Sequence, residues 1–235
     1  MTTAERAAFL TFAQAIARAD AKRVLAMLSS RPELATLPTD EGASRGGAPD
    51  YFLEEIAHYI YAGDTALHVA AAAFQAGIAR QLLRRGAEVR VRNRRGAEPL
   101  HYAADTNHWN PAAQARTIAC LIAAGADPNA VDRDGVAPLH RAVRTRSAAA
   151  VRALLDGGAN PGLRNGSGSM PVDLARRTTG RGGSGSERAR EQQAGIIRLL
   201  LERGARASDK DGRGKRVRDA AKSEWIGRLL DGGDG

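Results

Sequence analysis

The chain has 235 residues, a mass of 24.8 kDa and 43% hydrophobic residues, so it can bury a sizeable core. Only 4% of the residues are aromatic, which argues against a wide sheet or sandwich and favours close-packed helices of Ala, Leu, Ile and Val. The single cysteine, Cys120, excludes an internal disulfide, and its apolar neighbours predict that it is buried. No apolar run has membrane-spanning length, and the first residues lack the pattern of a signal peptide. We therefore expect a cytoplasmic protein.

The net charge of +9 is unevenly distributed along the chain. Residues 1–79 hold 6 Lys and Arg against 9 Asp and Glu, whereas residues 80–235 hold 29 against 17, which gives −3 and +12. A basic C-terminal part indicates a partner with acidic or phosphate groups. The alternative, that the arginines reflect coding bias, stays open at this point.

Residues 1–36 predict a pair of helices. Thr2 and Glu5 have the spacing of a capping box, and Asp20 is a suitable start for the second helix. Apolar residues follow at helical spacing: Phe9, Phe12, Ala13 and Ile16, then Val24, Leu25 and Leu28. We expect this pair to act as an N-terminal capping helix pair that covers the first repeat.

Residues 37–62 form a second region, a loop followed by a short aromatic segment. Residues 37–50 are rich in Gly, Pro and small polar residues, which predicts a mobile surface loop. In residues 51–61 the apolar spacing predicts a short helix, with Phe52, Leu53 and Ile56 packed against the first repeat and Tyr61 left for binding.

Repeats occupy residues 63–235. A Gly-Ala pair closes an apolar segment at Gly86, Gly125, Gly158 and Gly204, at intervals of 39, 33 and 46 residues. Another Gly recurs at Gly63, Gly96, Gly135, Gly168 and Gly214, at intervals of 33, 39, 33 and 46. The base period is therefore 33, in about five units with insertions near 105–116 and 178–193, the last unit being shortened.

Each unit predicts two helices. The openings GDTALHVAAA, GAEPLHYAAD and GVAPLHRAVR place a turn Gly before a short helix of small residues. The second helices, such as VRALLDGGA, have apolar residues at helical spacing and end at Gly. Because one pair cannot bury both faces, neighbours must stack, with Leu83, Leu121, Leu154 and Leu200 aligned along one apolar seam.

These openings, together with GADPNAVDRDG at residues 125–135, resemble the ankyrin repeat family. The resemblance implies an all-α ankyrin repeat solenoid of stacked helix-turn-helix units with hairpin-like loops. It also implies that His68, His101 and His140 are structural, bonding near the start of each first helix. Asp173 and Asp219 occupy that position in the last two units, so we expect the hydrogen bonding between units to change toward the C-terminus.

The resemblance further implies a non-catalytic protein–protein interaction module whose contact surface is the hairpin tips and the exposed side of each first helix. We expect an acidic partner on this concave, Arg-rich face, since guanidinium groups bind carboxylate and phosphate well. Tyr61 and Trp109 are expected anchors, although Trp109 could instead fold back on the repeats. The other expected contacts are Arg92, Arg94, Arg95, Asp105, Arg133, Arg144, Arg164, Arg177, Lys210 and Arg213.

Catalytic and metal-binding motifs are not found in the sequence. Gly180, Gly182 and Gly185 fit GxGxxG, but no strand precedes them, and the histidines recur once per unit rather than as a cluster. We therefore expect no enzyme, no cofactor, no metal and no membrane association. The alternatives are nucleic-acid or other polyanion binding by the basic C-terminal part and, more remotely, an unrecognised hydrolase. The sequence makes no prediction of oligomeric state.

Overall fold

The computed structural model describes residues 1–44, 49–105, 110–177 and 186–232. The chain divides into two compact units, unit 1 (Met1–Asp127) and unit 2 (Pro128–Gly235). In the described residues, extended pairing is limited to one short hairpin and an isolated bridge between Lys210 and Arg216. The all-α class predicted from the sequence is therefore confirmed.

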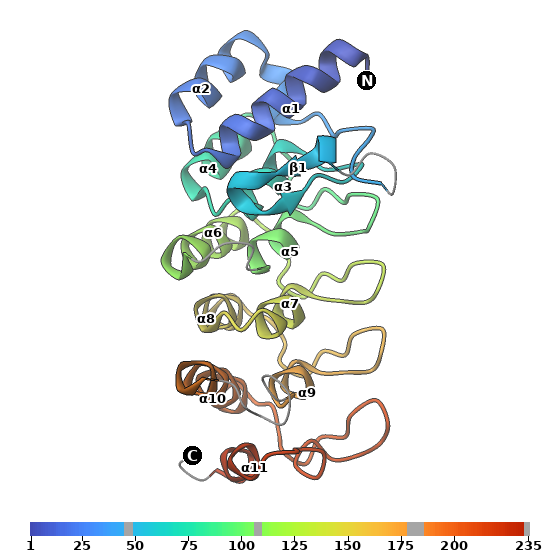
Figure 1. The fold of residues 1–235 in the computed structure, drawn as a ribbon, viewed down its shortest axis with the longest axis vertical. Helices are drawn as coiled ribbons and strands as arrows, with labels where there is room; N and C mark the ends of the chain where they lie inside the picture. The colour runs from blue at the N-terminus through green and yellow to red at the C-terminus, as the bar shows by residue number, and fades with distance from the viewer. Residues whose placement is uncertain (45–48, 106–109, 178–185, 233–235) are drawn as a thin grey trace. The chain divides into compact units, whose positions relative to one another are not determined.

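Unit 1 consists of three consecutive helix pairs (Figure 1). They are α1 (Thr3–Ala17) with α2 (Ala21–Ser30), α3 (Ala66–Ala72) with α4 (Ala76–Arg84), and α5 (Pro99–Ala104) with α6 (Pro111–Ala123). The helix α3 packs against both α1 and α5, and α4 packs against α6. The predicted capping box is present, because Thr2 Oγ1 accepts from the Glu5 backbone N–H at 3.2 Å.

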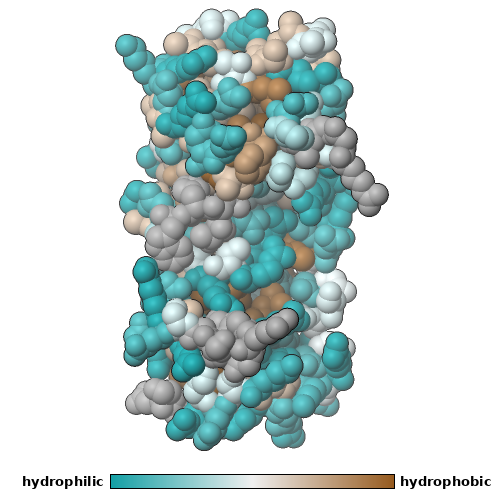
Figure 2. Space-filling view, in the orientation of Figure 1, coloured by the Kyte–Doolittle hydropathy of each residue, from teal (hydrophilic) through white to brown (hydrophobic). Residues whose placement is uncertain are grey.

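Unit 2 continues the same plan. Its helices are α7 (Pro138–Arg144), α8 (Ala148–Asp156), α9 (Pro171–Ala175), α10 (Glu187–Glu202) and α11 (Glu224–Leu230). Short first helices pack on one another, α7 on α9, and long second helices pack on one another, α8 on α10, with α11 against α10. Hydrophilic side chains cover most of the face of this unit that Figure 2 shows, as its charge predicts.

The first helices end in two different ways. After α3 and α7, Phe74 (φ 54°) and Arg146 (φ 60°) take the left-handed conformation, which usually favours Gly. After α5 and α9, where the chain has insertions, Gln114 and Gln193 replace this turn. Each Nε2 donates to two carbonyls at the end of the preceding first helix, Gln193 to Ala175 at 2.6 Å and to Arg177 at 2.8 Å. A side-chain amide therefore satisfies helix-end carbonyls that the inserted backbone leaves open.

The prediction of a helix at residues 51–61 is wrong. This segment is a hairpin, in which β1 (Phe52–Leu53) pairs antiparallel with β2 (His58–Tyr59) across the 3-10 turn Glu54–Ile56. Leu53 and Ile56 are buried as expected, but Phe52 is 37% exposed and its ring lies 4.7 Å from that of Tyr59. Alternating burial in a strand turns Phe52 outward, next to its cross-strand neighbour.

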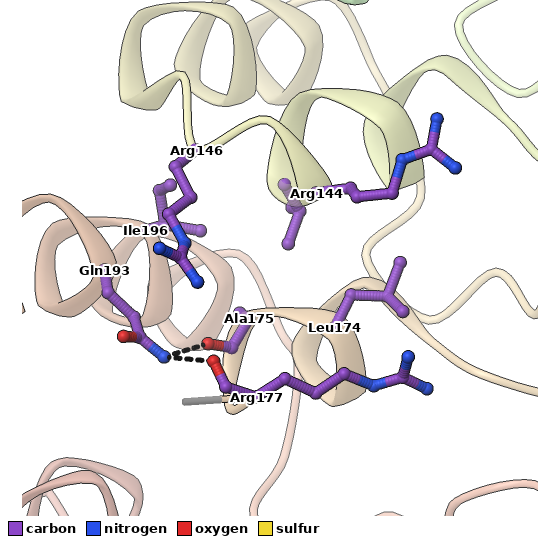
Figure 3. A pocket seen from close by; sticks show the side chains of 8 residues that line it. Arg144, Arg146, Leu174, Ala175, Arg177, Gln193 and Ile196 are labelled. Atoms are coloured by element: carbon purple, nitrogen blue, oxygen red, sulfur yellow. Dashed lines mark hydrogen bonds between the residues drawn. The ribbon is translucent and has the colours of Figure 1, made fainter. Parts of the chain in front are cut away.

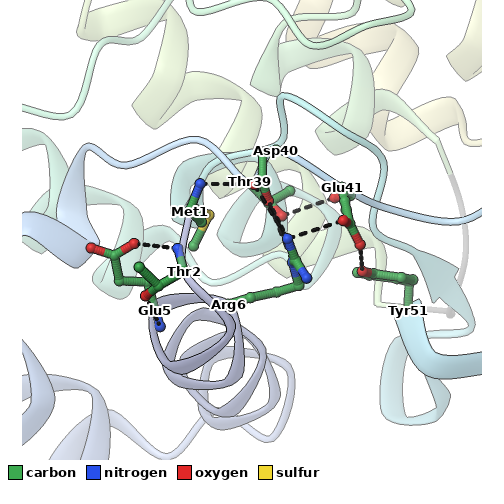
Figure 4. Close-up of polar contacts among 8 residues, drawn as sticks. All are labelled: Met1, Thr2, Glu5, Arg6, Thr39, Asp40, Glu41 and Tyr51. Carbon is green, nitrogen blue, oxygen red and sulfur yellow. Dashed lines mark hydrogen bonds and ion pairs between the residues drawn. The ribbon is translucent and has the colours of Figure 1, made fainter.

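Residues 37–44 differ from the expected mobile surface loop. Thr39 and Ala43 are buried, and they run antiparallel to residues 60–64 through backbone hydrogen bonds, such as Ala43 N–H to the Ile60 carbonyl at 2.7 Å. Figure 4 shows the side chains that hold this segment on α1: Arg6 donates to the carboxylate of Asp40 and lies 3.0 Å from that of Glu41. Further 3-10 turns lie at Pro32–Ala35 and Pro49–Tyr51.

Two details of the predicted core also change. Leu82, rather than Leu83, is fully buried in α4, whereas Leu121, Leu154 and Leu200 are buried in their units as expected. Cys120 is only half-buried, with Sγ 3.8 Å from the Ala76 carbonyl oxygen. The seam of a helix is about a third of its circumference, so positions one residue off it stay near the surface.

Candidate functional site

Each hairpin tip is built around one Asn or Asp, which recurs once per repeat. At Asn93, Asp132, Asn165 and Asp211 a side-chain oxygen accepts the backbone N–H groups two and four residues later, at 2.9–3.0 Å. The intervals between these residues, 39, 33 and 46, repeat those of the glycines three residues further on. The side chain closes the tip as an Asx turn does, so the residues it encloses are held outward.

Neighbouring tips of unit 2 lie in direct contact. The Gly166 N–H donates to the Asp134 carbonyl at 3.0 Å, and Arg164 donates to the carbonyls of Gly168 and Lys210. A Cβ at Gly212 would lie 2.7 Å from the Ser167 carbonyl oxygen, so only Gly allows this approach. Arg164 and the backbone of Lys210 therefore hold the tips together, in addition to being on the predicted contact surface.

The repeated histidines have the structural role that the resemblance implied. Nδ1 of His68, His101 and His140 accepts the backbone N–H three residues earlier, at 3.1–3.2 Å. Since Nδ1 is an acceptor, Nε2 carries the proton. In His68 it lies 3.1 Å from the Ala97 carbonyl oxygen, and in His140 it lies 3.2 Å from that of Ser169. The imidazoles of His68 and His140 thus each join one repeat to the next within their own unit.

In unit 2 the hydrogen bond between repeats is made differently at Asp173, which stands at the position of the repeated His. Asp173 Oδ2 accepts the Met170 N–H at 2.9 Å, but a carboxylate cannot donate a hydrogen bond to the following repeat. Arg176 makes that connection instead. It donates to the Ala220 carbonyl at 2.9 Å and to Asp211 at 3.1 Å, and it lies 3.4 Å from Asp173. The expected change of hydrogen bonding toward the C-terminus is present.

The histidines predict a loss of stability in mild acid. Burial lowers the pKa of His68 and His140 below the ordinary value near 6.5, so the unfolded chain takes up protons first. Their contribution to the free energy of unfolding is complete above pH 6.5 and is lost as the pH falls toward the folded-state pKa. We expect urea denaturation to show this loss between pH 7.5 and 5.0. His140→Gln should be less stable at pH 7.5 and less pH-dependent, and parallel curves would contradict this account.

Three of the contact residues predicted in unit 1, Tyr61, Arg94 and Arg95, lie together at one tip. The guanidinium carbons of Arg94 and Arg95 lie 5.7 and 4.9 Å from the centroid of the Tyr61 ring, a cation–π arrangement. Arg94 also donates to the Ala43 carbonyl. The face of Tyr61 is therefore engaged within the chain, and the exposed groups that remain here are the two guanidinium groups.

Other predicted residues in unit 1 have separate surroundings. Arg92 lies 3.2 Å from Glu98, whose carboxylate is 1% exposed, so this arginine serves an internal ion pair. Burial raises the pKa of Glu98, against the opposing effect of Arg92 and Arg90. The backbone carbonyl of Asp105 accepts from Gln114. Trp109 lies outside the described residues.

In unit 2 the structure brings Arg144 and Arg177 to one pocket of about 210 Å³ (Figure 3). We call it the arginine-rimmed pocket. Its apolar floor is Val143, Leu174, Ala175 and Ile196, and its other lining residues are Arg146 and Gln193. In Figure 3 the Arg146 head points toward Gln193 and Ala175, whereas Arg144 and Arg177 extend along the rim. Arg146 was not expected here, because only the left-handed turn after α7 turns it inward.

Burial lowers the pKa of Arg146, since its guanidinium is partly withdrawn from water. Among the described residues this side chain has no hydrogen bond or ion pair, and no carboxylate lines the pocket. A half-desolvated cation of this kind favours an acceptor from outside the chain.

A second pocket, of about 460 Å³, shares Arg177 with the first. We call it the polar pocket. It is lined by Ser167, Ser169, Asp173, Arg176, Arg177, Asp211, Gly212, Arg213 and Lys222. Arg177 and Arg213 were predicted contact residues, whereas Arg176 and Lys222 were missed. The partners of Arg176 lie 35 and 44 residues away in the sequence, and Lys222 is brought to Ser167 and Ser169 only by the fold. Arg133 is exposed on its own tip and lines neither pocket.

Comparison with known proteins identifies the repeats. A family model of ankyrin repeats, in three copies, matches residues 67–165. Residues 67–165 are ankyrin repeats. The chain is 35% identical over 113 residues to mouse "Ankyrin repeat and SOCS box protein 16" and 39% identical over 115 residues to Drosophila melanogaster "Tyrosine-protein kinase Shark". It is 36% identical over 117 residues to Arabidopsis thaliana "E3 ubiquitin-protein ligase KEG".

Each match covers about half of this chain, 48%, 47% and 50%, but only 12%, 25% and 6% of the fly, mouse and plant proteins. The chain spans a quarter or less of each of these proteins, and the activities in those names belong to those proteins. Within the described ranges, no group of three or more His, Cys, Asp or Glu could hold a metal ion. None of the helices described has the length and apolar character needed to cross a membrane.

Proposed function

We propose that this chain is a non-catalytic binding module that holds an acidic segment of another protein against the arginines of unit 2. Ankyrin repeats are generally protein–protein interaction modules and generally lack catalytic activity. The further step, the acidic partner and the surface it contacts, is carried by the charges of the paired pockets, the arginine-rimmed pocket and the polar pocket.

Six cationic side chains and two carboxylates line the paired pockets. Both carboxylates, Asp173 and Asp211, are already engaged by Arg176. Arg146, Arg177, Arg213 and Lys222 have no ion pair among the described residues, so a partner's carboxylates would lower their mutual repulsion and gain charge-assisted hydrogen bonds. This surplus is the observation on which the proposal depends.

In unit 1, the exposed guanidinium groups of Arg94 and Arg95 over Tyr61 would provide further contacts of the same kind, and Arg133 offers an isolated one in unit 2. Nucleic-acid binding is less well supported. Neither of the paired pockets has an aromatic side chain on which a base could stack.

Selection from a random peptide display library tests the proposal. We expect the protein to enrich peptides rich in Asp and Glu, and Arg144→Glu with Arg177→Glu to abolish that enrichment. The matched control is Arg152→Glu with Arg188→Glu, which makes the same change of net charge at exposed positions on α8 and α10 outside both pockets.

The control variant should select the same peptides as the unaltered protein. Selection without acidic enrichment, or an equal effect of the two double variants, would reject the proposed surface. Binding to random DNA and RNA should be undetectable near physiological salt, because a peptide-binding surface needs no long run of phosphates.

A further inference from the structure

The polar pocket has a surplus of cations with no partner in the chain. In the described structure, the side chains of Arg177, Arg213 and Lys222 form no ion pair and no hydrogen bond, although all three line this pocket. Unpaired surface cations are common when they point into water. Three that border a single cavity of about 460 Å³ instead raise the local concentration of anions.

The carboxylates of the pocket cannot supply the missing charge. Asp211 Oδ1 accepts the backbone N–H groups of Arg213 and Lys215, and its Oδ2 accepts from Arg176. Burial acts to raise the pKa of Asp211, but these donors outweigh it and lower the pKa, so the carboxylate stays ionised. Asp173 is held by the Met170 N–H and by Arg176. Arg176 is thus neutralised by its own neighbours, and the other three cations are not.

The size and donors of the pocket indicate which anion fits. A single carboxylate would neutralise one charge, whereas a phosphate monoester carries about −1.5 to −2 at pH 7 and three acceptor oxygens. Three cations surround the cavity, and the hydroxyl-bearing Ser167 and Ser169 line it beside them. A volume of about 460 Å³ falls within the range of roughly 300–1,000 Å³ that is usual for small-ligand sites.

The adjoining arginine-rimmed pocket adds a second requirement. It shares Arg177 with the polar pocket, and its apolar floor includes Leu174 and Ile196. Its volume of about 210 Å³ lies below the small-ligand range. A site of this size beside an anion site suits one aliphatic side chain of the same bound segment.

We propose that the polar pocket binds the phosphoryl group of a phosphoserine or phosphothreonine in the partner, while the arginine-rimmed pocket takes an aliphatic side chain close to it in the partner's sequence. This inference rests on the proposed function and specifies the chemistry of the segment that is held. Recognition is by the phosphoryl oxygens rather than by acidity alone.

Fluorescence polarisation with degenerate peptide libraries tests it. Three labelled libraries share random flanks and differ only at the central residue, which is phosphoserine, glutamate or serine. We expect the phosphoserine library to bind at least about tenfold more tightly than either of the others, as one or more charge-assisted hydrogen bonds would give. Peptides retained from it should be enriched in Leu, Ile or Val near the phosphoserine. Inorganic phosphate should compete.

Arg213→Gln with Lys222→Gln should remove the preference for phosphoserine. These side chains have no partner among the described residues, so we expect the variant to keep the circular dichroism spectrum and Tm of the parent. The matched control, Arg152→Gln with Arg188→Gln, should retain the preference.

Several outcomes would overturn the inference. These are equal binding of the glutamate and phosphoserine libraries, no binding of the phosphoserine library, a preference that survives Arg213→Gln with Lys222→Gln, and tighter binding of a random RNA of the same length. Each of the first three leaves the acidic-peptide selection untouched. A failure of the phosphoryl site is therefore distinguishable from a failure of the proposed function.

Discussion

Leu154→Ala should lower the free energy of unfolding by about 2–5 kcal/mol. Leu154 lies in α8, is 0% exposed, and packs in the helix layer that α8 forms with α7 and α10. Truncation removes the transfer energy of the buried methyl groups and leaves a cavity, because neighbouring helices relax only partly. Urea denaturation followed by circular dichroism measures the loss.

The substitution should also act beyond its own helix pair. In a repeat array each pair is stabilised by its neighbours, so α10 should exchange its amide hydrogens faster as well as α8. Arg152→Ala, at an exposed position of the same helix, is the control and should change stability by less than about 0.5 kcal/mol. Faster exchange limited to α7 and α8 would contradict this coupling.

Arg141→Leu should cost about 3–5 kcal/mol, because it leaves a buried carboxylate without its cation. The Arg141 guanidinium lies 2.7 Å from Asp132, and the two side chains are only 10% and 6% exposed. Asp132 cannot turn to water, since its other oxygen closes the hairpin tip by accepting from Asp134 and Val136. Denaturation with urea again gives the measurement.

The equivalent residues of unit 1 indicate a double variant that should restore the lost stability. At the equivalent positions unit 1 has Asn93 and Tyr102, with Nδ2 of Asn93 donating to the tyrosine oxygen at 2.8 Å. Asn93 also closes its tip through Oδ1, so the tip itself needs no charge, and Asn93 Nδ2 and the Tyr102 hydroxyl donate in addition to the carboxylate of Asp64. Arg141→Tyr with Asp132→Asn should therefore recover more than about half of the loss. If Arg141→Leu were neutral, or the double variant no more stable than Arg141→Leu, the buried ion pair would not be the cause.

Much of the helical framework was predictable from the sequence because its signals are local. The capping residues Thr2 and Asp20 and the burial of Leu121, Leu154 and Leu200 all follow from spacings within a few turns of helix. The histidine bonds followed from the family resemblance. They repeat because each unit places the same side chain against the same neighbouring carbonyl.

The segment at residues 51–61 could not be assigned in the same way. Its apolar residues fit helical spacing and strand alternation about equally over so short a run. Long-range contacts determine the hairpin. Residues 37–44 form backbone hydrogen bonds with residues 60–64, which holds the end of this segment extended rather than helical. Ala57, in the left-handed conformation (φ 46°), makes the turn.

By itself, the sequence determined that the chain is a series of helix pairs with a 33-residue base period and a basic C-terminal part. Only the tertiary structure decided which arginines are available. Arg92, Arg141 and Arg176 are engaged by internal carboxylates, and Arg164 by backbone carbonyls, whereas Arg177 and Arg213 face a pocket. Helical periodicity is written within a few residues, but several of an arginine's partners lie 35 to 46 residues away, and packing alone brings them within reach.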